Sequence, residues 1–207
     1  MRDTEPLMPF HARLPAPPAL WLVRHAQPLL APGLCYGATN VPADPHATHQ
    51  AALAIAPELP THITVISSTL QRCELLAQHL KGLRPGLTYK TDARLTEMDF
   101  GCWEGQRWDA IPRAAYDAWT ADFAHHRFGG QESVTEFMQR VSAAWHDSHQ
   151  RPGPVLWVTH AGVIRAATRL SQGISTVTQA SQWPVEAPAF GGWCTLPLGP
   201  WLGERVG

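Results

Sequence analysis

The amino-acid sequence predicts an α/β fold with three layers, α/β/α, in which helices cover both faces of a mostly parallel sheet. Short apolar runs recur along the chain, have the length of buried strands and end in polar residues. Segments with helical apolar spacing follow these runs, and such an alternation is typical of a parallel sheet. Apolar residues make up 44% of the 207 residues, which is enough for the core of one domain.

The first half of the chain predicts a tail and two strand–helix units. Residues 1–18 contain five prolines, which remove backbone donors and block helix formation, so an extended tail outside the core is expected. The units that follow are a strand over 19–23, a helix over 46–59 that stops at Pro60, a strand over 63–66 and a helix from Thr69 that ends at Gly82.

The second half predicts a further strand–helix pattern around a long excursion. A weaker strand over 87–91 leads into residues 93–131, which are rich in aromatic side chains. Ser133 and Glu136 have the spacing of a capping box and predict the start of a helix. The remaining elements are a strand over 155–158, a helix opened by Ala161 and one or two closing strands within 184–202.

Composition and charge exclude several classes of protein. The formal net charge of −1 argues against binding to long nucleic acids or to anionic membranes. The longest apolar runs are too short to span a bilayer, and the first ten residues lack the apolar stretch of a secretory signal. No two of the four cysteines are spaced as C-x-x-C, which favours free thiols in a reducing compartment. We therefore expect a cytoplasmic protein, either monomer or homodimer.

Cationic side chains follow three of the predicted strands. Arg24 and His25 end the first strand, Arg72 lies one turn into the helix after the second, and His160 ends the strand over 155–158. Ligands of parallel sheets bind beyond the carboxyl ends of the strands, so we expect these groups to converge. Guanidinium groups and helix N-termini bind phosphate, and no acidic cluster for Mg²⁺ is apparent. The sequence thus predicts an anion site without metal or cofactor.

Four ordered motifs resemble those of the histidine phosphatase superfamily, also called the phosphoglycerate mutase-like family. They are Leu22-Val23-Arg24-His25, Ser67-Ser68-Thr69-Leu70-Gln71-Arg72, the segment 95–105 with Glu97, and Val158-Thr159-His160-Ala161-Gly162. Glu132-Ser133 and Arg140-Val141 resemble a further family element. The resemblance implies the phosphoglycerate mutase-like fold and a histidine phosphatase domain over 19–207.

The resemblance also implies a mechanism and roles for five residues. Neutral His25 would attack phosphorus and form a phosphohistidine, while its other ring nitrogen donates a hydrogen bond to a backbone carbonyl. Arg24, Arg72 and His160 would hold the phosphoryl oxygens. Glu97 would protonate the leaving alcohol and then activate water. The implied protein is a metal-independent phosphomonoesterase, a phosphoric monoester hydrolase that acts on a small phosphorylated metabolite.

Some positions depart from the family pattern and leave alternatives open. Ala26, Pro28 and Ala31 stand where the family usually has Gly, a hydroxyl and Asn, which weakens the match to phosphoglycerate mutases. The segments 33–37 and 39–42 resemble α-ribazole phosphatases of cobalamin biosynthesis, so α-ribazole 5′-phosphate is the first substrate to test. A mutase-type phosphotransferase and a catalytically silent binding protein remain the alternatives.

Several further residues have weaker signals. Tyr36 and Trp103 are candidates for the substrate rim, because aromatic side chains often line the mouth of a small-molecule site. Arg165 and Glu104 are expected to brace loops rather than to contact substrate. The histidine pairs His46/His49 and His125/His126 fit solvated positions better than a metal site.

Overall fold

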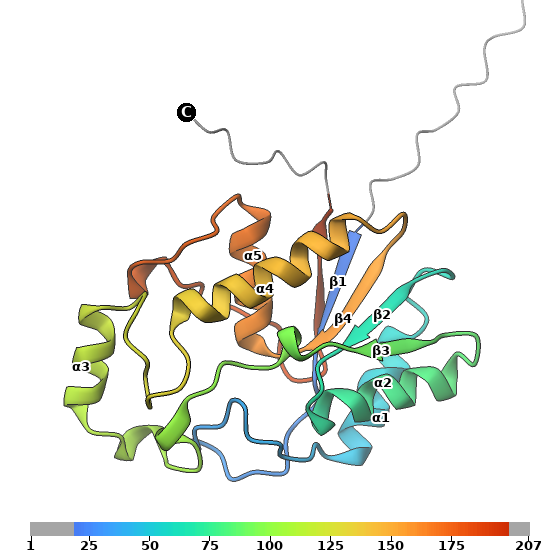
Figure 1. Ribbon diagram of the computed structural model, residues 1–207. Helices are drawn as coiled ribbons and strands as arrows, with labels where there is room; N and C mark the ends of the chain where they lie inside the picture. The colour runs from blue at the N-terminus through green and yellow to red at the C-terminus, as the bar shows by residue number, and fades with distance from the viewer. Residues whose placement is uncertain (1–18, 199–207) are drawn as a thin grey trace, which may run out of the picture.

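The computed structural model describes residues 19–198, so the predicted tail at 1–18 lies outside the described residues. A five-stranded sheet with strand order β3-β2-β4-β1-β5 forms the centre of the domain (Figure 1). Its strands are β1 (Ala19–Arg24), β2 (Thr64–Ser67), β3 (Tyr89–Thr91), β4 (Val155–Thr159) and β5 (Trp193–Pro197). All neighbouring pairs are parallel except β1 and β5, which are antiparallel. The prediction of a mostly parallel sheet is confirmed.

Helices cover both faces of this sheet, as predicted. The helices are α1 (Pro45–Ile55), α2 (Gln71–Leu83), α3 (Arg113–Ala121), α4 (Val134–His149) and α5 (Ala161–Ser171). In Figure 1, α4 and α5 lie on one side of the strands and α1 and α2 on the other, while α3 lies at one end, away from the sheet. Short 3-10 helices span Ala93–Leu95, Gly101–Trp103, Trp108–Ala110 and Ala180–Gln182.

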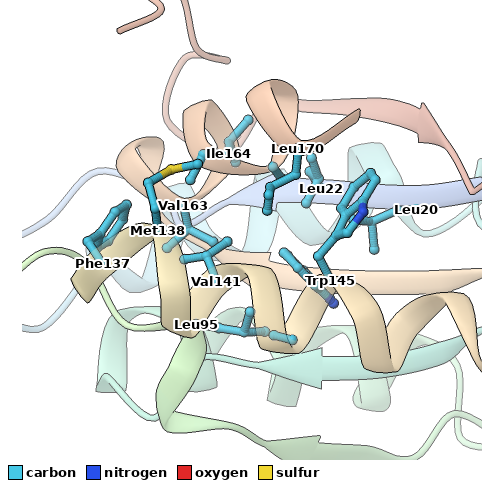
Figure 2. Close-up of a cluster of buried hydrophobic side chains, with 14 of the residues drawn as sticks. Leu20, Leu22, Leu95, Phe137, Met138, Val141, Trp145, Val163, Ile164 and Leu170 are labelled. Atoms are coloured by element: carbon cyan, nitrogen blue, oxygen red, sulfur yellow. The ribbon is translucent and has the colours of Figure 1, made fainter. Parts of the chain in front are cut away.

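The alternation of side chains along the central strands explains the two-sided core. Leu22 and Trp157 pack with α4 and α5, whereas their neighbours Val23 and Val158 pack with α1 and α2. Successive side chains of a strand point to opposite faces, so every second residue joins the same cluster. Figure 2 shows the first cluster, in which Leu20 and Leu22 face side chains from α4 and α5.

Two helix boundaries differ from the prediction, and proline explains both. Helix α1 ends at Ile55 rather than near Pro60, because Pro57 has no N–H to continue the helical ladder. Gly82 lies inside α2 and does not end it. The helix instead ends at Leu83, since Arg84 precedes Pro85 and a residue before proline is disfavoured in helical conformation.

The capping box at the start of α4 is present as predicted. The Ser133 side chain accepts from the Glu136 backbone N–H, and the Glu136 carboxylate accepts from the Ser133 N–H. No helix among residues 19–198 has the length and apolar character needed to cross a lipid bilayer.

Candidate active site

Pairing of β1 with β4 brings the two histidines together. The parallel register places Arg24 opposite Thr159, and the His25 backbone N–H donates to the Thr159 carbonyl at 3.0 Å. His25 and His160 are therefore the next residues of two adjacent strands that run in the same direction. Their ring centroids lie 5.1 Å apart. The predicted convergence at the carboxyl edge of the sheet is present for these two residues.

The His25 imidazole is held in one tautomer. Its Nδ1 lies 2.7 Å from the Ala26 carbonyl oxygen, which can only accept a hydrogen bond, so Nδ1 carries the proton. The ring is buried and only 2% exposed. Burial, together with the positive charges of Arg72 and Arg24, lowers the pKa of His25 to about 3. His25 is thus neutral at pH 7, with the lone pair of Nε2 available.

His160 is fully buried beside His25 and has partners at both ring nitrogens. Arg72 Nε donates to Nδ1 at 3.3 Å, so the proton lies on Nε2, which is 2.8 Å from the Ser68 hydroxyl. Burial and the nearby charge of Arg72 keep the pKa of His160 well below its usual value. To hold a phosphate oxygen, His160 has to exchange its hydrogen bond to Ser68 for one to the ligand.

Arg72 is fully buried and joins the histidine pair to the loop after His25. Its Nη2 donates to the Gly37 carbonyl at 2.6 Å, and its Nη1 donates to the Thr39 carbonyl at 2.7 Å. With the bond to His160, these contacts use three of the five N–H groups of a guanidinium, and two have no acceptor within the described part of the chain. Arg72 therefore lies where the prediction placed it, next to His160.

Arg24, the residue before His25, has a buried donor without an acceptor among the described residues. Its Nη1 donates to the Pro188 carbonyl at 3.1 Å, and its guanidinium carbon lies 3.9 Å from the centre of the Phe190 ring. Its Nε is buried and has no hydrogen-bond partner among the described residues. Burial lowers the pKa of Arg24. A buried cationic N–H without an acceptor favours the binding of an anion.

The Glu97 carboxylate lies at the N-terminus of α5. Its Oε2 accepts from the Gly162 backbone N–H at 2.9 Å, and its Oε1 from the Met98 N–H at 3.1 Å. A Cβ at position 162 would lie 2.1 Å from Oε1, so only glycine allows this approach. The charge of Glu97 acts on both Arg24 and Arg72. The predicted acid is thus near both guanidinium groups.

An ion pair from α4 holds the backbone that carries Glu97. Arg140 Nε lies 2.6 Å from Glu132 Oε1, and both side chains are mostly buried. The guanidinium also donates to the carbonyls of Arg94, Thr96 and Glu97 at 2.7–2.9 Å. These contacts make Glu132 and Arg140 positioning residues. The sequence motifs indicate these two residues but assign them no role.

Glu104 braces the loops around the site, as expected. Its carboxylate accepts from the backbone N–H groups of Ala38, Thr39 and Phe100 at 2.6–3.0 Å. The hydrogen bonds to Ala38 and Thr39 tie the loop after His25 to the segment after Glu97. Arg165 also holds a loop, since its Nη2 donates to the Val185 carbonyl at 2.8 Å.

The two predicted rim residues occupy different places. Tyr36 lies beside the arginines: its ring centre is 5.3 Å from the Arg72 guanidinium carbon, and its hydroxyl interacts with Arg24. Burial raises the pKa of Tyr36. Trp103 instead packs in an aromatic cluster around Phe128, with ring centroids 5.9 Å apart. Tyr36 is therefore next to the candidate phosphate site, whereas Trp103 is part of the packing of the excursion.

Two cavities adjoin Glu97. One has a volume of about 410 Å³ and is lined mainly by aromatic and aliphatic side chains, together with Glu97, Gly162 and Arg165. The other, of about 370 Å³, is lined mainly by polar and acidic side chains. The sequence did not reveal either cavity, because their walls come from segments that are distant in the chain.

Comparison with known proteins places the chain in a family. A sequence model of the histidine phosphatase superfamily (branch 1) matches residues 20–186. The chain belongs to this superfamily. The match spans the four predicted motifs in order, which confirms the resemblance noted in the sequence.

Other histidine phosphatase relatives agree with this placement. A protein of Hydrogenobacter thermophilus named "Putative phosphoserine phosphatase 2" is 31% identical over 162 residues, which are 75% of this chain and 79% of the relative. The structure of TTHB049 from Thermus thermophilus is 26% identical, with a TM-score of 0.64 and coverage of 86% and 92% of the two chains. Mycobacterial glucosyl-3-phosphoglycerate phosphatase Rv2419c shares the fold at 24% identity, with a TM-score of 0.70 and coverage of 86% and 89%.

Sequence reasoning missed several contacts of the candidate site. Pro188 and Phe190 contact Arg24, and Phe190 also lies 5.5 Å from the His25 ring. These residues precede the antiparallel edge strand β5 and lie outside the four motifs. Ser68, by contrast, belongs to the second motif, but its bond to His160 depends on β2 lying next to β4.

Proposed function

We propose that this protein is a metal-independent phosphomonoesterase that transfers the phosphoryl group of its substrate to His25 and then to water. The observation that carries the proposal is the fixed tautomer of His25. The bond from Nδ1–H to the Ala26 carbonyl leaves the lone pair on Nε2, and burial keeps the ring neutral. Such an imidazole is a nucleophile at pH 7 without a separate base.

The reaction is proposed as two in-line displacements. His25 Nε2 forms a bond to phosphorus while the bond from phosphorus to the alcohol oxygen breaks, and Glu97, which takes up a proton when the ester binds, gives that proton to the alcohol oxygen. In the second step a water oxygen attacks phosphorus and passes a proton to Glu97, while the bond from phosphorus to Nε2 breaks. Inorganic phosphate leaves, and both side chains return to their starting states.

Cationic donors stabilise the charge that develops on the phosphoryl oxygens. Arg24 contributes its buried Nε, and Arg72 contributes the N–H groups that no acceptor among residues 19–198 uses. His160, whose ring is neutral, is the third proposed donor, through its Nε2–H. The fixed charges of the two arginines take the part that a divalent cation has in other phosphatases, so chelation with EDTA is expected to leave the rate unchanged. A large loss of rate with EDTA would contradict the metal-independent route.

Trapping the intermediate tests the proposal directly. The protein is mixed with a phosphomonoester, quenched in alkali because phosphohistidine is labile to acid, and analysed by mass spectrometry. We expect a phosphorylated peptide that contains His25 in the wild type and in the control His125→Ala, an exposed histidine in the excursion. His25→Ala should carry no label. Turnover of the ester without any phosphorylated His25 would refute the covalent route.

The substrate is proposed to be a small phosphorylated metabolite, and a panel of esters tests which one. Phosphoserine and glucosyl-3-phosphoglycerate enter the panel because the relatives are named for them. α-Ribazole 5′-phosphate enters because segments 33–37 and 39–42 resemble its phosphatases. In the structure, Gly37 and Thr39 of that region bind Arg72 through their carbonyls. Interconversion of 2- and 3-phosphoglycerate without release of phosphate would instead identify a mutase.

A further inference from the structure

The larger cavity beside Glu97 has a mostly aromatic wall. Its volume of about 410 Å³ is within the range of sites for small organic molecules. The ring-bearing side chains that line it come from the excursion, from α3, from α4 and from the segment before β5, and they are Phe100, Trp119, Phe123, Phe137 and Trp183. A wall of this kind binds planar or apolar groups better than a compact charged molecule.

Two lining residues carry buried donors without acceptors. Trp119 Nε1 and Arg165 Nε are both buried and have no hydrogen-bond partner among residues 19–198. Within the same residues, Arg165 forms no ion pair with a carboxylate, and its Nη2 donates to the Val185 carbonyl. Buried donors without acceptors cost free energy, and a ligand that brings an acceptor recovers it.

The cavity adjoins the residue proposed to protonate the leaving alcohol. Glu97 and Gly162 line it, and the Gly162 N–H holds the Glu97 carboxylate. Arg165 lies near enough to Arg24 for its charge to lower the pKa of that residue. A leaving alcohol that takes its proton from Glu97 can therefore place the rest of its structure in this cavity.

The second cavity beside Glu97 is less suited to the leaving group. Four carboxylates line it, from Glu97, Asp99, Glu132 and Glu136, and its single guanidinium, Arg140, is already paired with Glu132. This excess of negative charge repels a phosphate ester. Charge therefore favours the aromatic cavity.

We infer that the aromatic cavity is the leaving-group pocket of this enzyme, and that its substrates are phosphate esters of alcohols that carry an aromatic ring with an anionic or carbonyl acceptor. The ring packs against the aromatic wall, and the acceptor binds Arg165. This inference rests on the proposed phosphatase function, and it adds a substrate class and a specificity residue to it.

Three esters of primary alcohols test the inference, because their leaving groups have similar acidity and differ mainly in what they place in the cavity. They are ethyl phosphate, 2-phenylethyl phosphate and the phosphate ester of 4-(2-hydroxyethyl)benzoate. We expect kcat/KM to rise about tenfold or more with the ring, and about tenfold again with the carboxylate.

Two variants separate these contributions. Arg165→Gln should abolish the increase in kcat/KM that the carboxylate gives and keep the increase that the ring gives. Ala180→Trp fills the cavity from an exposed position on its wall and should abolish the gain from the ring. The control Arg113→Gln removes an exposed arginine from α3 and should preserve both ratios.

The outcomes distinguish this inference from the proposed function. Equal kcat/KM for all three esters would overturn the pocket while leaving the phosphatase intact. If no ester is hydrolysed, calorimetry with the free alcohol 4-(2-hydroxyethyl)benzoate decides the matter. Binding that Arg165→Gln weakens would support the pocket, whereas absence of both binding and hydrolysis would overturn it. The trapping of phosphorylated His25 with the metabolite panel then decides the phosphatase separately.

Discussion

The strand ends and the excursion contribute to the same site by different physical means. His25 and His160 follow adjacent parallel strands, so the hydrogen-bonded register of β1 and β4 places them. Glu97 lies in a segment without regular strand or helix, between two short 3-10 helices. Its position depends on side chains from elsewhere, namely Arg140, Glu132 and Glu104.

This difference indicates which half of the proposed reaction is more sensitive to substitutions elsewhere in the protein. The nucleophile is placed by backbone hydrogen bonds that any sequence of suitable apolar residues can form. The acid is placed by a few charged side chains and one glycine. Substitutions away from the reacting atoms should therefore affect proton transfer more readily than phosphoryl transfer, and the following experiments test that contrast.

The largest effect is expected from the strand-end region. His25→Ala should lower kcat by more than about 10⁴-fold, because the neighbouring imidazole of His160 has its lone pair on Nδ1 bonded to Arg72 and cannot replace the nucleophile. Circular dichroism and thermal unfolding should show a folded protein, and inorganic vanadate should still bind through Arg24 and Arg72. Substantial residual activity in this variant would show that the strand ends do not supply the nucleophile.

Gly162→Ala tests how tightly Glu97 is positioned. The new Cβ would lie 2.1 Å from Glu97 Oε1 and displace the carboxylate, so we expect kcat to fall about 10²-fold while vanadate affinity stays. Gly82→Ala is the matched control, since Gly82 also lies in a helix but has open space around its Cβ position. That control should keep full activity and gain about 0.5–1 kcal/mol in stability. Equal activity in both variants would contradict the placement of the acid.

Arg140→Gln examines the ion pair that supports the excursion. Loss of the guanidinium leaves Glu132 unpaired and frees the carbonyls before Met98, so kcat should fall about tenfold and stability by about 2–4 kcal/mol. The double variant Arg140→Gln with Glu132→Gln should recover part of the stability, since no buried charge remains. Urea unfolding and kcat measured on the same samples distinguish the two effects. An unchanged kcat would show that Glu97 is held by Gly162 alone.

Acid should lower the free energy of unfolding gradually, because His25 at the end of β1 is buried and neutral. The pKa of His25 is about 3 in the folded protein and about 6.5 in the unfolded chain, so only the unfolded chain takes up this proton between those values. Stability therefore falls as pH drops below about 6.5. His25→Gln should make this fall less steep by about 1.4 kcal/mol per pH unit at most. His125→Ala, which removes an exposed histidine, should leave the slope unchanged, and equal slopes for all three proteins would refute a buried neutral His25.

Much of the fold could be predicted because its signals are local. The apolar runs that became β1, β2 and β4, and the capping box before α4, depend on neighbouring residues alone. The predicted ends of α1 and α2 are wrong because the backbone constraints of Pro57 and Pro85 outweigh the apolar spacing and Gly82. The excursion could not be resolved into α3 and its 3-10 helices, since its structure depends on packing around the buried Phe128.

The candidate site also has a part that the sequence predicts and a part that it does not. The motifs located His25, Arg24, Arg72, His160 and Glu97, because each lies in a short run whose residue types indicate phosphate chemistry. The contacts of Arg24 with Phe190, and of Arg140 with the Glu97 carbonyl, join residues that are far apart in the chain. No local pattern encodes such contacts.

By itself, the sequence determined the alternation of strands and helices, the residues at the strand ends and the family to which they belong. Only the tertiary structure decided that β1 and β4 are neighbours in a register that sets His25 beside His160, and that an aromatic cavity opens next to Glu97. The reason is that residue type and spacing act over a few residues, whereas strand order and cavity shape arise when distant segments pack together and exclude water.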